Sequence, residues 1–149
     1  MARTLFPAPR PQGSRRFMTS FNAFYAIKSD LKSDFSGNQN HHFGNVLCYI
    51  GKGFGAVAAP AGFEDSFTNT TLVLASGGSY GSGQCSAKSG ESPVAVGGNA
   101  IFTQDGTVEE CGLPLAQYQA KTGNDKGSTV AVWPSDADLI AKVRQVLYV

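Results

Sequence analysis

The sequence predicts a mainly β protein, namely a compact β-sandwich or β-barrel-like domain with an extended N-terminal arm and one short C-terminal helix. Eighteen glycines are spread over 149 residues, and apolar residues seldom recur with the 3.6-residue period of a helix. The first 28 residues hold five arginine or lysine residues and three prolines. A sustained apolar stripe at helical spacing occurs only near the C-terminus. We therefore divide the chain into an arm, residues 1–40, and a single β-rich domain, residues 41–149.

The arm is predicted to be extended and to contact other protein subunits. Pro7, Pro9 and Pro11 fix their own φ angles and push the preceding residues away from the helical region. Residues 1–27 carry four arginines and no acidic residue, which leaves a net charge of −3 on the rest of the chain. Four arginines are few for phosphate-driven binding, so protein contact is favoured over nucleic acid. The anchoring residues would be Phe6, Arg10, Arg15, Arg16, Phe17, Phe21, Phe24 and Tyr25.

Strands and turns are expected to alternate over most of the body. Apolar runs predict strands at 46–50, 54–59, 70–75, 93–96, 99–103, 106–110 and 128–133. Asp105-Gly106 predicts a hairpin between the strands at 99–103 and 106–110, because glycine tolerates positive φ. A second hairpin turn is expected at Gly51–Gly55. Residues 21–32 are the only early helix candidate, since aromatic residues recur there at roughly helical spacing.

The clearest helix begins near Ser135. Either Ser135 or Asp136 can cap its first turn, and acidic residues in that turn suit the helix macrodipole. Apolar residues recur at helical spacing over 139–147, which predicts that the helix packs on the sheet. Residues 148 and 149 are then expected to pair or pack as a short terminal strand.

No pattern of residues indicates a catalytic, cofactor or metal site. His41 and His42 are the only histidines, and adjacent side chains in an extended loop diverge, so the two are poorly placed to bind one metal ion. Gly51–Gly55 includes Lys52 but departs from the phosphate-loop pattern G-x-x-x-x-G-K-[ST]. No nucleophile signature or acid–base pair is recognisable. We therefore expect no enzymatic activity and no cofactor.

The cysteine spacing argues against a metal site, and the hydropathy pattern argues against a membrane span. Cys48, Cys85 and Cys111 lack the close spacing of a metal site. Reduced thiols are the default expectation, Cys48 is predicted to be buried in its apolar run, and a Cys85–Cys111 bridge stays open. No run of about 18 apolar residues occurs, so no membrane span is expected.

The end of the chain carries a family resemblance. The stretch TVAVWP, residues 129–134, is followed by SDAD and by a short helical segment ending in VLYV. This ending resembles that of tailed-bacteriophage head decoration, or cement, proteins. The resemblance covers the C-terminal strand and helix only. It implies a small β-rich protein that forms trimers on a capsid and adds an extended N-terminal arm to the shell lattice. A strand followed by a helix opening in Ser-Asp also looks like the end of single-stranded RNA phage coat proteins, whose long second helix has no counterpart here.

The leading hypothesis is a virion structural protein, a decoration subunit that stabilises the capsid by binding neighbouring subunits through its arm. Its partners would be the major capsid protein and further copies of the chain, with no membrane involved. It would be made in the host cytoplasm and reside in the virion. Three alternatives stay open. The chain can be a coat protein that forms the shell itself, a structural subunit of an organellar complex, or a ligand-binding β domain that uses the loops GKGFG and SGGSYG.

Overall fold

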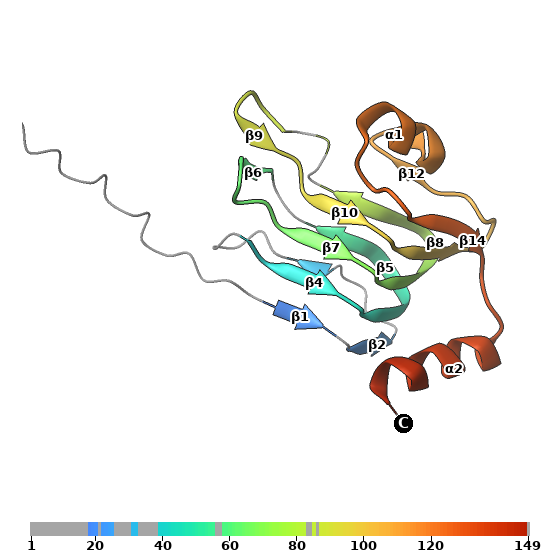
Figure 1. Ribbon diagram of the computed structural model, residues 1–149. Coiled ribbons are helices and arrows are strands. Elements are labelled where there is room, and N and C mark those ends of the chain that lie inside the picture. The colour runs from blue at the N-terminus through green and yellow to red at the C-terminus, as the bar shows by residue number, and fades with distance from the viewer. Residues whose placement is uncertain are drawn as a thin grey trace, which may run out of the picture.

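Two parallel sheets dominate the structure (Figure 1). This computed structural model describes residues 18–20, 22–25, 31, 32, 39–55, 58–82, 85 and 87–148. Sheet A has the order β1 (Met18–Ser20), β4 (His41–Phe43), β7 (Ser66–Thr68) and β10 (Ala95–Gly97). Sheet B has the order β14 (Thr129–Val132), β11 (Ala100–Thr103), β8 (Thr71–Ser82), β5 (Val46–Gly55) and β2 (Ala23–Tyr25), and β3 (Leu31–Lys32) pairs with the end of β5.

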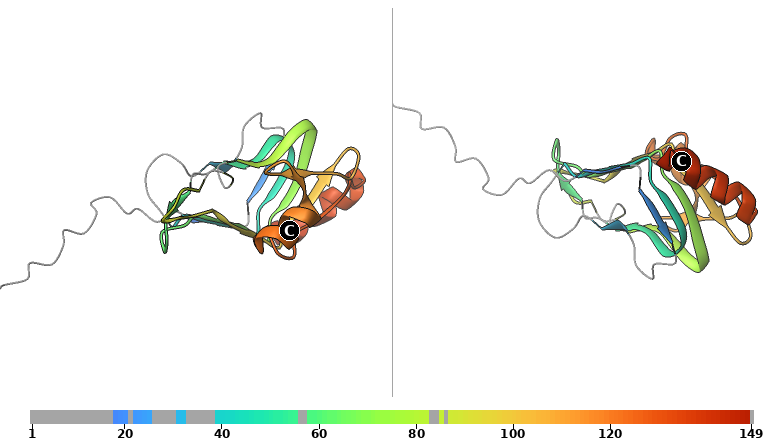
Figure 2. Two further views of the ribbon diagram at one scale, coloured as in Figure 1. Left: turned by 90° about the horizontal axis from the view of Figure 1, so that it is seen from above. Right: turned by 90° about the horizontal axis from the view of Figure 1, so that it is seen from below.

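The sheets are built by a chain that winds rather than by hairpins. Strands β4, β7 and β10 of sheet A each lead through a two-residue turn into a strand of sheet B, and after β5 and β8 the chain returns to the next strand of sheet A. In sheet A the register aligns Met18, His41, Ser66 and Ala95; in sheet B it aligns Ala23, Val46, Thr71, Ala100 and Thr129. The architecture is therefore a parallel β-solenoid, in which each coil stacks on the previous one. Figure 2 shows the two sheets facing each other across the interior.

A repeated turn joins sheet A to sheet B. Its first residue has positive φ, which favours glycine and asparagine: Gly44 (64°), Asn69 (51°), Gly98 (67°) and Gly127 (78°). Its second residue is polar and buried: Asn45, Thr70, Asn99 and Ser128. The Thr70 amide donates to the Asn99 carboxamide at 2.9 Å, and the Asn99 amide donates to the Ser128 hydroxyl at 2.8 Å. These bonds link successive coils and satisfy polar groups that are buried away from water.

The central strands of sheet B, β5 and β8, are buried on both faces over most of their described length. The inner face of sheet B contributes Leu47, Leu72 and Ile101 to the core between the sheets. Its outer face contributes Val46, Cys48 and Val73 to a second cluster, which is covered by Leu139 of α2 (Asp136–Leu147). Strands buried on both faces need no alternation of apolar and polar residues, which explains the continuous runs VLCYI and TLVL. These runs were correctly predicted to be strands.

The two helices close different parts of the solenoid. In α2 the Ser135 side chain caps the first turn by accepting a bond from the Asp138 amide at 3.2 Å, as predicted. A second helix, α1 (Leu115–Thr122), was not predicted. It follows an antiparallel pair, β12 (Glu109–Glu110) and β13 (Leu113–Pro114). Leu115 joins the core between the sheets, so α1 covers the end of the core nearest β10 (Figure 1).

The mainly β fold and the C-terminal helix are confirmed, but several local predictions are wrong. The Asp105-Gly106 hairpin does not form, because β11 pairs in parallel with β8 and β14 while β12 pairs with β13. Residues 51–55 continue β5 and make no turn. The helix candidate at 21–32 contains β2 and β3 instead. Tyr148 ends α2 in a left-handed conformation and forms no strand.

Part of the predicted arm is built into the sheets. β1 pairs with β4, and β2 and β3 pair with β5, although all three strands lie within residues 1–40. Outside both sheets, β6 (Ala59–Pro60) pairs with β9 (Glu91–Ser92) in an antiparallel ladder beside sheet A (Figure 1).

Candidate functional site

Most of the predicted partner-binding residues lie outside the part of the chain that the structure describes. These residues are Phe6, Arg10, Arg15, Arg16, Phe17 and Phe21. Phe24 and Tyr25 lie in β2, where their backbones pair with those of Leu47 and Cys48. Their assignment as partner contacts stays a prediction.

The outer face of sheet A carries a hydrogen-bonded pair of side chains. His41 of β4 and Ser66 of β7 occupy paired positions in the parallel ladder, and His41 Nδ1 lies 2.7 Å from Ser66 Oγ. His41 is exposed and Ser66 is half-buried. Ala95 of β10 follows Ser66 in the same row and lines the adjoining cavity with its small side chain. Ser66 is therefore a hydroxyl in contact with an imidazole on an accessible surface.

A shallow cavity of about 350 Å³ adjoins this pair, lined by Gln39, His41, Gly62, Glu64, Ser66 and Ala95. Glu64 is held in place because its carboxylate accepts a bond from the Gly62 amide at 2.8 Å. That bond, together with its own backbone amide and the Ser92 hydroxyl, lowers the pKa of Glu64. The Gln39 carboxamide donates to the Gly62 carbonyl at 2.7 Å. The cavity thus holds one carboxylate and several groups that can form hydrogen bonds.

A buried polar ladder lies immediately before the pair in sequence. Asn40 precedes His41, and Asp65 precedes Ser66. The Asp65 carboxylate accepts bonds from the Asn40 amide at 2.8 Å and from the Asn40 side chain at 3.0 Å. The Ser66 amide donates to the Asn40 carbonyl at 2.9 Å. Because both residues of the ladder are buried, they fix the backbone that carries His41 and Ser66.

His41 and His42 point to opposite faces of β4, as predicted for adjacent residues. His42 is buried in the interior, where its ring stacks on Phe67 at a centroid distance of 4.5 Å. Neither ring nitrogen of His42 has a hydrogen-bond partner among the described residues, and burial lowers its pKa. In the described part of the chain no group of three His, Cys, Asp or Glu side chains can hold a metal ion.

A cluster of five polar side chains lies inside the solenoid next to α1, namely Tyr80, Asn99, Glu110, Asp125 and Ser128. Asp125 is fully buried, and its carboxylate accepts bonds from the Tyr80 hydroxyl at 3.1 Å and from the Ser128 hydroxyl. Burial raises the pKa of Asp125, and a hydrogen bond with Glu110 acts in the opposite direction. Because two neighbouring buried carboxyl groups disfavour a second negative charge, we expect the pair to hold one proton. The side chains of the cluster are buried, and their hydrogen bonds join β8 to the turns that precede β11 and β14.

The edges of the two sheets differ at the end of the solenoid near α1. At the edge of sheet A, the Asn124 side chain accepts a bond from the Val96 amide at 3.3 Å and donates to the Val94 carbonyl at 3.0 Å. At the edge of sheet B, β14 pairs with β11 on one side and with no described strand on the other. Thr129, Ala131 and Val132 of β14 are exposed, Val132 to 60%. Among the described residues, a side chain of the chain itself therefore occupies the edge of sheet A, whereas Gly106 lies close to Val132 of β14.

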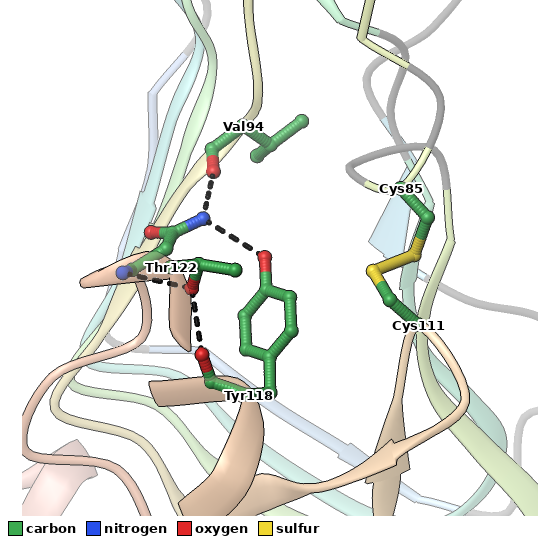
Figure 3. Close-up of a disulfide and its surroundings, with 6 residues drawn as sticks. Cys85, Val94, Cys111, Tyr118 and Thr122 are labelled. Carbon is green, nitrogen blue, oxygen red and sulfur yellow. Dashed lines mark hydrogen bonds between the residues drawn. A yellow bond between two sulfur atoms is a disulfide. The ribbon is translucent and has the colours of Figure 1, made fainter. Parts of the chain in front are cut away.

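A disulfide joins Cys85 to Cys111, which corrects the expectation of reduced thiols for this pair (Figure 3). Cys48 is a free thiol and is buried, as predicted. The bridge borders a cavity of about 390 Å³ that also contacts Tyr118, Thr122 and Asn124. Tyr118 and Thr122 lie across this cavity from the bridge, and the Thr122 hydroxyl donates to the Tyr118 carbonyl at 2.8 Å (Figure 3).

Comparison with known proteins assigns no family to this chain. No protein-family model matches it, no curated protein matches it, and no solved structure matches it. Among the described residues no helix is long and apolar enough to cross a membrane.

Sequence reasoning missed both the His41–Ser66 pair and the open edge of β14. The two partners of the pair are separated by 25 residues, and only the coil register brings them together. One signal was present, because His41 and Ser66 each directly follow a polar residue at the start of a short strand. The open edge depends on strand order, which the composition of β14 does not reveal.

Proposed function

We propose that this protein is a structural subunit of a protein assembly, which joins neighbouring copies of itself through the open edge of β14. The resemblance of its C-terminal strand and helix to phage head decoration proteins makes a virion decoration subunit the specific form of this proposal. The N-terminal arm would supply additional contacts to the same neighbours, including the major capsid protein. The observation that carries the proposal is the contrast between the occupied edge of sheet A and the open edge of sheet B.

The backbone of β14 supports strand pairing. The amides of Thr129 and Trp133 donate bonds to carbonyls on the β11 side at 2.9 and 3.0 Å. Neighbouring residues of a strand turn their backbone groups to opposite sides, so Val130 and Val132 present theirs to the open side. An unpaired strand edge is a template for another chain. Natural proteins protect such edges with charges or proline, and β14 contains neither.

A second copy is the occupant that fits this edge. A two-fold contact between two β14 strands pairs the backbone of Val130 with that of Val132 in the neighbouring copy, and the reverse pair follows from the symmetry. Sheet B would then continue across the contact. The uncharged sequence TVAV has high strand propensity and presents no like charges to itself.

Two edge variants and one control test this proposal. Val132→Pro removes a backbone N–H on the open side while the N–H groups of Thr129 and Trp133 that bond toward β11 stay in place, and Val132→Lys adds a charge there. Ala120→Lys places the same charge on an exposed position of α1 and serves as the control. We expect sedimentation equilibrium to show self-association for the wild type and the control, and at least tenfold weaker association for both edge variants. Wild-type association of both edge variants would overturn the proposal.

The contribution of the arm needs a separate deletion. The deletion should end at residue 17, because β1 and β2 pair with the body. We expect the shortened chain to stay folded and to lose part of its occupancy in the assembly, measured by electron microscopy of reconstituted particles. Full occupancy would remove the arm from the proposed function without affecting the β14 contact.

A further inference from the structure

The His41–Ser66 pair has the geometry of a serine and its general base. The separation of 2.7 Å between His41 Nδ1 and Ser66 Oγ lies within the range in which a base removes a proton from a nucleophile. In the tautomer that carries its proton on Nε2, His41 accepts the Ser66 hydroxyl proton on Nδ1. The parallel register fixes both side chains on one face of sheet A.

The surroundings leave room for a reacting group next to Ser66. Ala95 occupies the neighbouring position in the row, and the cavity of about 350 Å³ opens onto both members of the pair. Glu64 lines the same cavity, and its pKa is lowered, so it is a carboxylate at neutral pH. A fixed negative charge at this place disfavours anionic acyl groups and accepts neutral or cationic ones.

Rigid support distinguishes this pair from a chance surface contact. Asn40 and Asp65 are only 3% and 4% exposed, and they bond to each other directly below the pair. The Ala95 amide also donates to the Asp65 carbonyl at 2.9 Å. The backbones of β4, β7 and β10 are therefore locked at the three positions that form the floor of the cavity.

We propose that Ser66 and His41 form an acyl-transfer site for neutral carboxylic esters with a good leaving group. Ser66 Oγ attacks the carbonyl carbon while its proton moves to His41 Nδ1. The tetrahedral intermediate collapses, the bond from carbon to the leaving oxygen breaks, and the leaving group takes the proton from His41. Water, activated by His41, then hydrolyses the acyl-Ser66 ester and restores both side chains. This activity goes beyond the proposed structural role and does not depend on it.

This proposal differs from the sequence-based expectation of no enzymatic activity. That expectation came from the absence of a local signature around any serine. Here the nucleophile and the base come from different coils of the solenoid, so no local signature is required.

A fluorophosphonate probe tests the proposal on the full chain. Reaction joins Ser66 Oγ to phosphorus and releases fluoride, and the serine proton passes to His41. We expect intact-mass analysis to show one adduct and peptide mapping to place it on Ser66. Ser66→Ala should abolish the adduct. His41→Asn keeps a hydrogen-bond acceptor but cannot take the proton, and should slow labelling at least ~100-fold.

A matched control separates a special serine from an ordinary one. Thr68→Ser, made in the Ser66→Ala background, places a serine hydroxyl on the same face of β7 two residues away, where the paired residue is Phe43 rather than a histidine. We expect no adduct on that serine. Release of p-nitrophenol from p-nitrophenyl acetate should follow the same order among the variants. An absent Ser66 adduct, or one that forms equally fast in His41→Asn, would overturn the proposal.

Discussion

Replacing Asp125 with asparagine tests whether the buried cluster holds a shared proton. Asp125 is fully buried, bonds to the Tyr80 and Ser128 hydroxyls, and contacts Glu110. In Asp125→Asn the carboxamide oxygen can still accept from both hydroxyls, and the new amide can donate to Glu110. The variant therefore preserves the hydrogen bonds while removing one titrating group.

The sign of the pH effect follows from the raised pKa of Asp125. Its usual value is 3.8, and burial raises it in the folded state. Its contribution to stability is fully present below pH 3.8 and is lost as the pH rises through the folded-state pKa. Between these two values the folded state binds one proton more than the unfolded state. The free energy of unfolding then falls by about 1.4 kcal/mol per pH unit.

Asp125→Asn should lack this pH-dependent contribution to the free energy of unfolding. Relative to the wild type, the variant should gain stability at about 1.4 kcal/mol per pH unit as the pH rises above 4. Asp125→Ala is the matched contrast, because it leaves the Tyr80 and Ser128 hydroxyls without their acceptor. At about 1–3 kcal/mol for each unsatisfied buried group, it should lose about 2–6 kcal/mol.

Urea denaturation between pH 4 and pH 7 measures these differences. Trp133 is the only tryptophan, and its indole N–H donates to the Leu74 carbonyl at 3.0 Å, so its fluorescence reports unfolding. Glu110→Gln leaves Asp125 buried, so the pH dependence that burial gives Asp125 should persist in that variant. Parallel stability curves for the wild type and Asp125→Asn would refute the shared proton.

Three further predictions concern the disulfide, a close backbone contact and the buried imidazole. Reducing the bridge between Cys85 and Cys111, 26 residues apart, should lower the free energy of unfolding by about 3–4 kcal/mol; the double serine variant should then be insensitive to reductant in urea titrations. An added Cβ in Gly53→Ala would overlap the Tyr80 carbonyl oxygen, so its thermal midpoint should fall, and an unchanged midpoint would contradict the close approach. Because burial lowers the pKa of His42, the free energy of unfolding should fall as the pH drops below 6.5, where the unfolded state binds a proton more readily. His42→Phe should remove that acid sensitivity in denaturation curves.

Elements that local sequence specifies were largely predictable. The strands β11 and β14 and the first halves of β5 and β8 coincide with apolar runs, and α2 begins at a capping serine. The segment SGGSYG, which was expected to be a loop, instead forms the second half of β8. α1 was missed because it has eight residues and only two of them are buried. Its end nevertheless carries a signal that could have been used, since Gly123 takes the left-handed conformation that commonly follows a helix.

Connectivity was not predictable from the same patterns. Asp105-Gly106 is a strong hairpin signal, but here the turn leads away from β11, which already has a parallel neighbour on each side. The turns that define the solenoid are instead the dipeptides Gly44-Asn45, Asn69-Thr70, Gly98-Asn99 and Gly127-Ser128. Each combines a residue suited to positive φ with a polar residue that bonds to a neighbouring coil. Their recurrence is a repeat signal, but its spacing varies between coils, which hides it from a search at a fixed period.

The candidate sites could not be predicted from the sequence either, because they depend on the connectivity of the strands. In a solenoid, residues that share a surface are those at equal positions in successive coils, so His41 meets Ser66 only if the register is known. An error of one residue in the register would turn Ser66 away from His41 and bring Phe67 to the outer face. The Asn40–Asp65 ladder prevents that slip, because its buried bonds form only in the observed register. The polar residues that fix the fold therefore also determine which side chains meet on the outer face of sheet A.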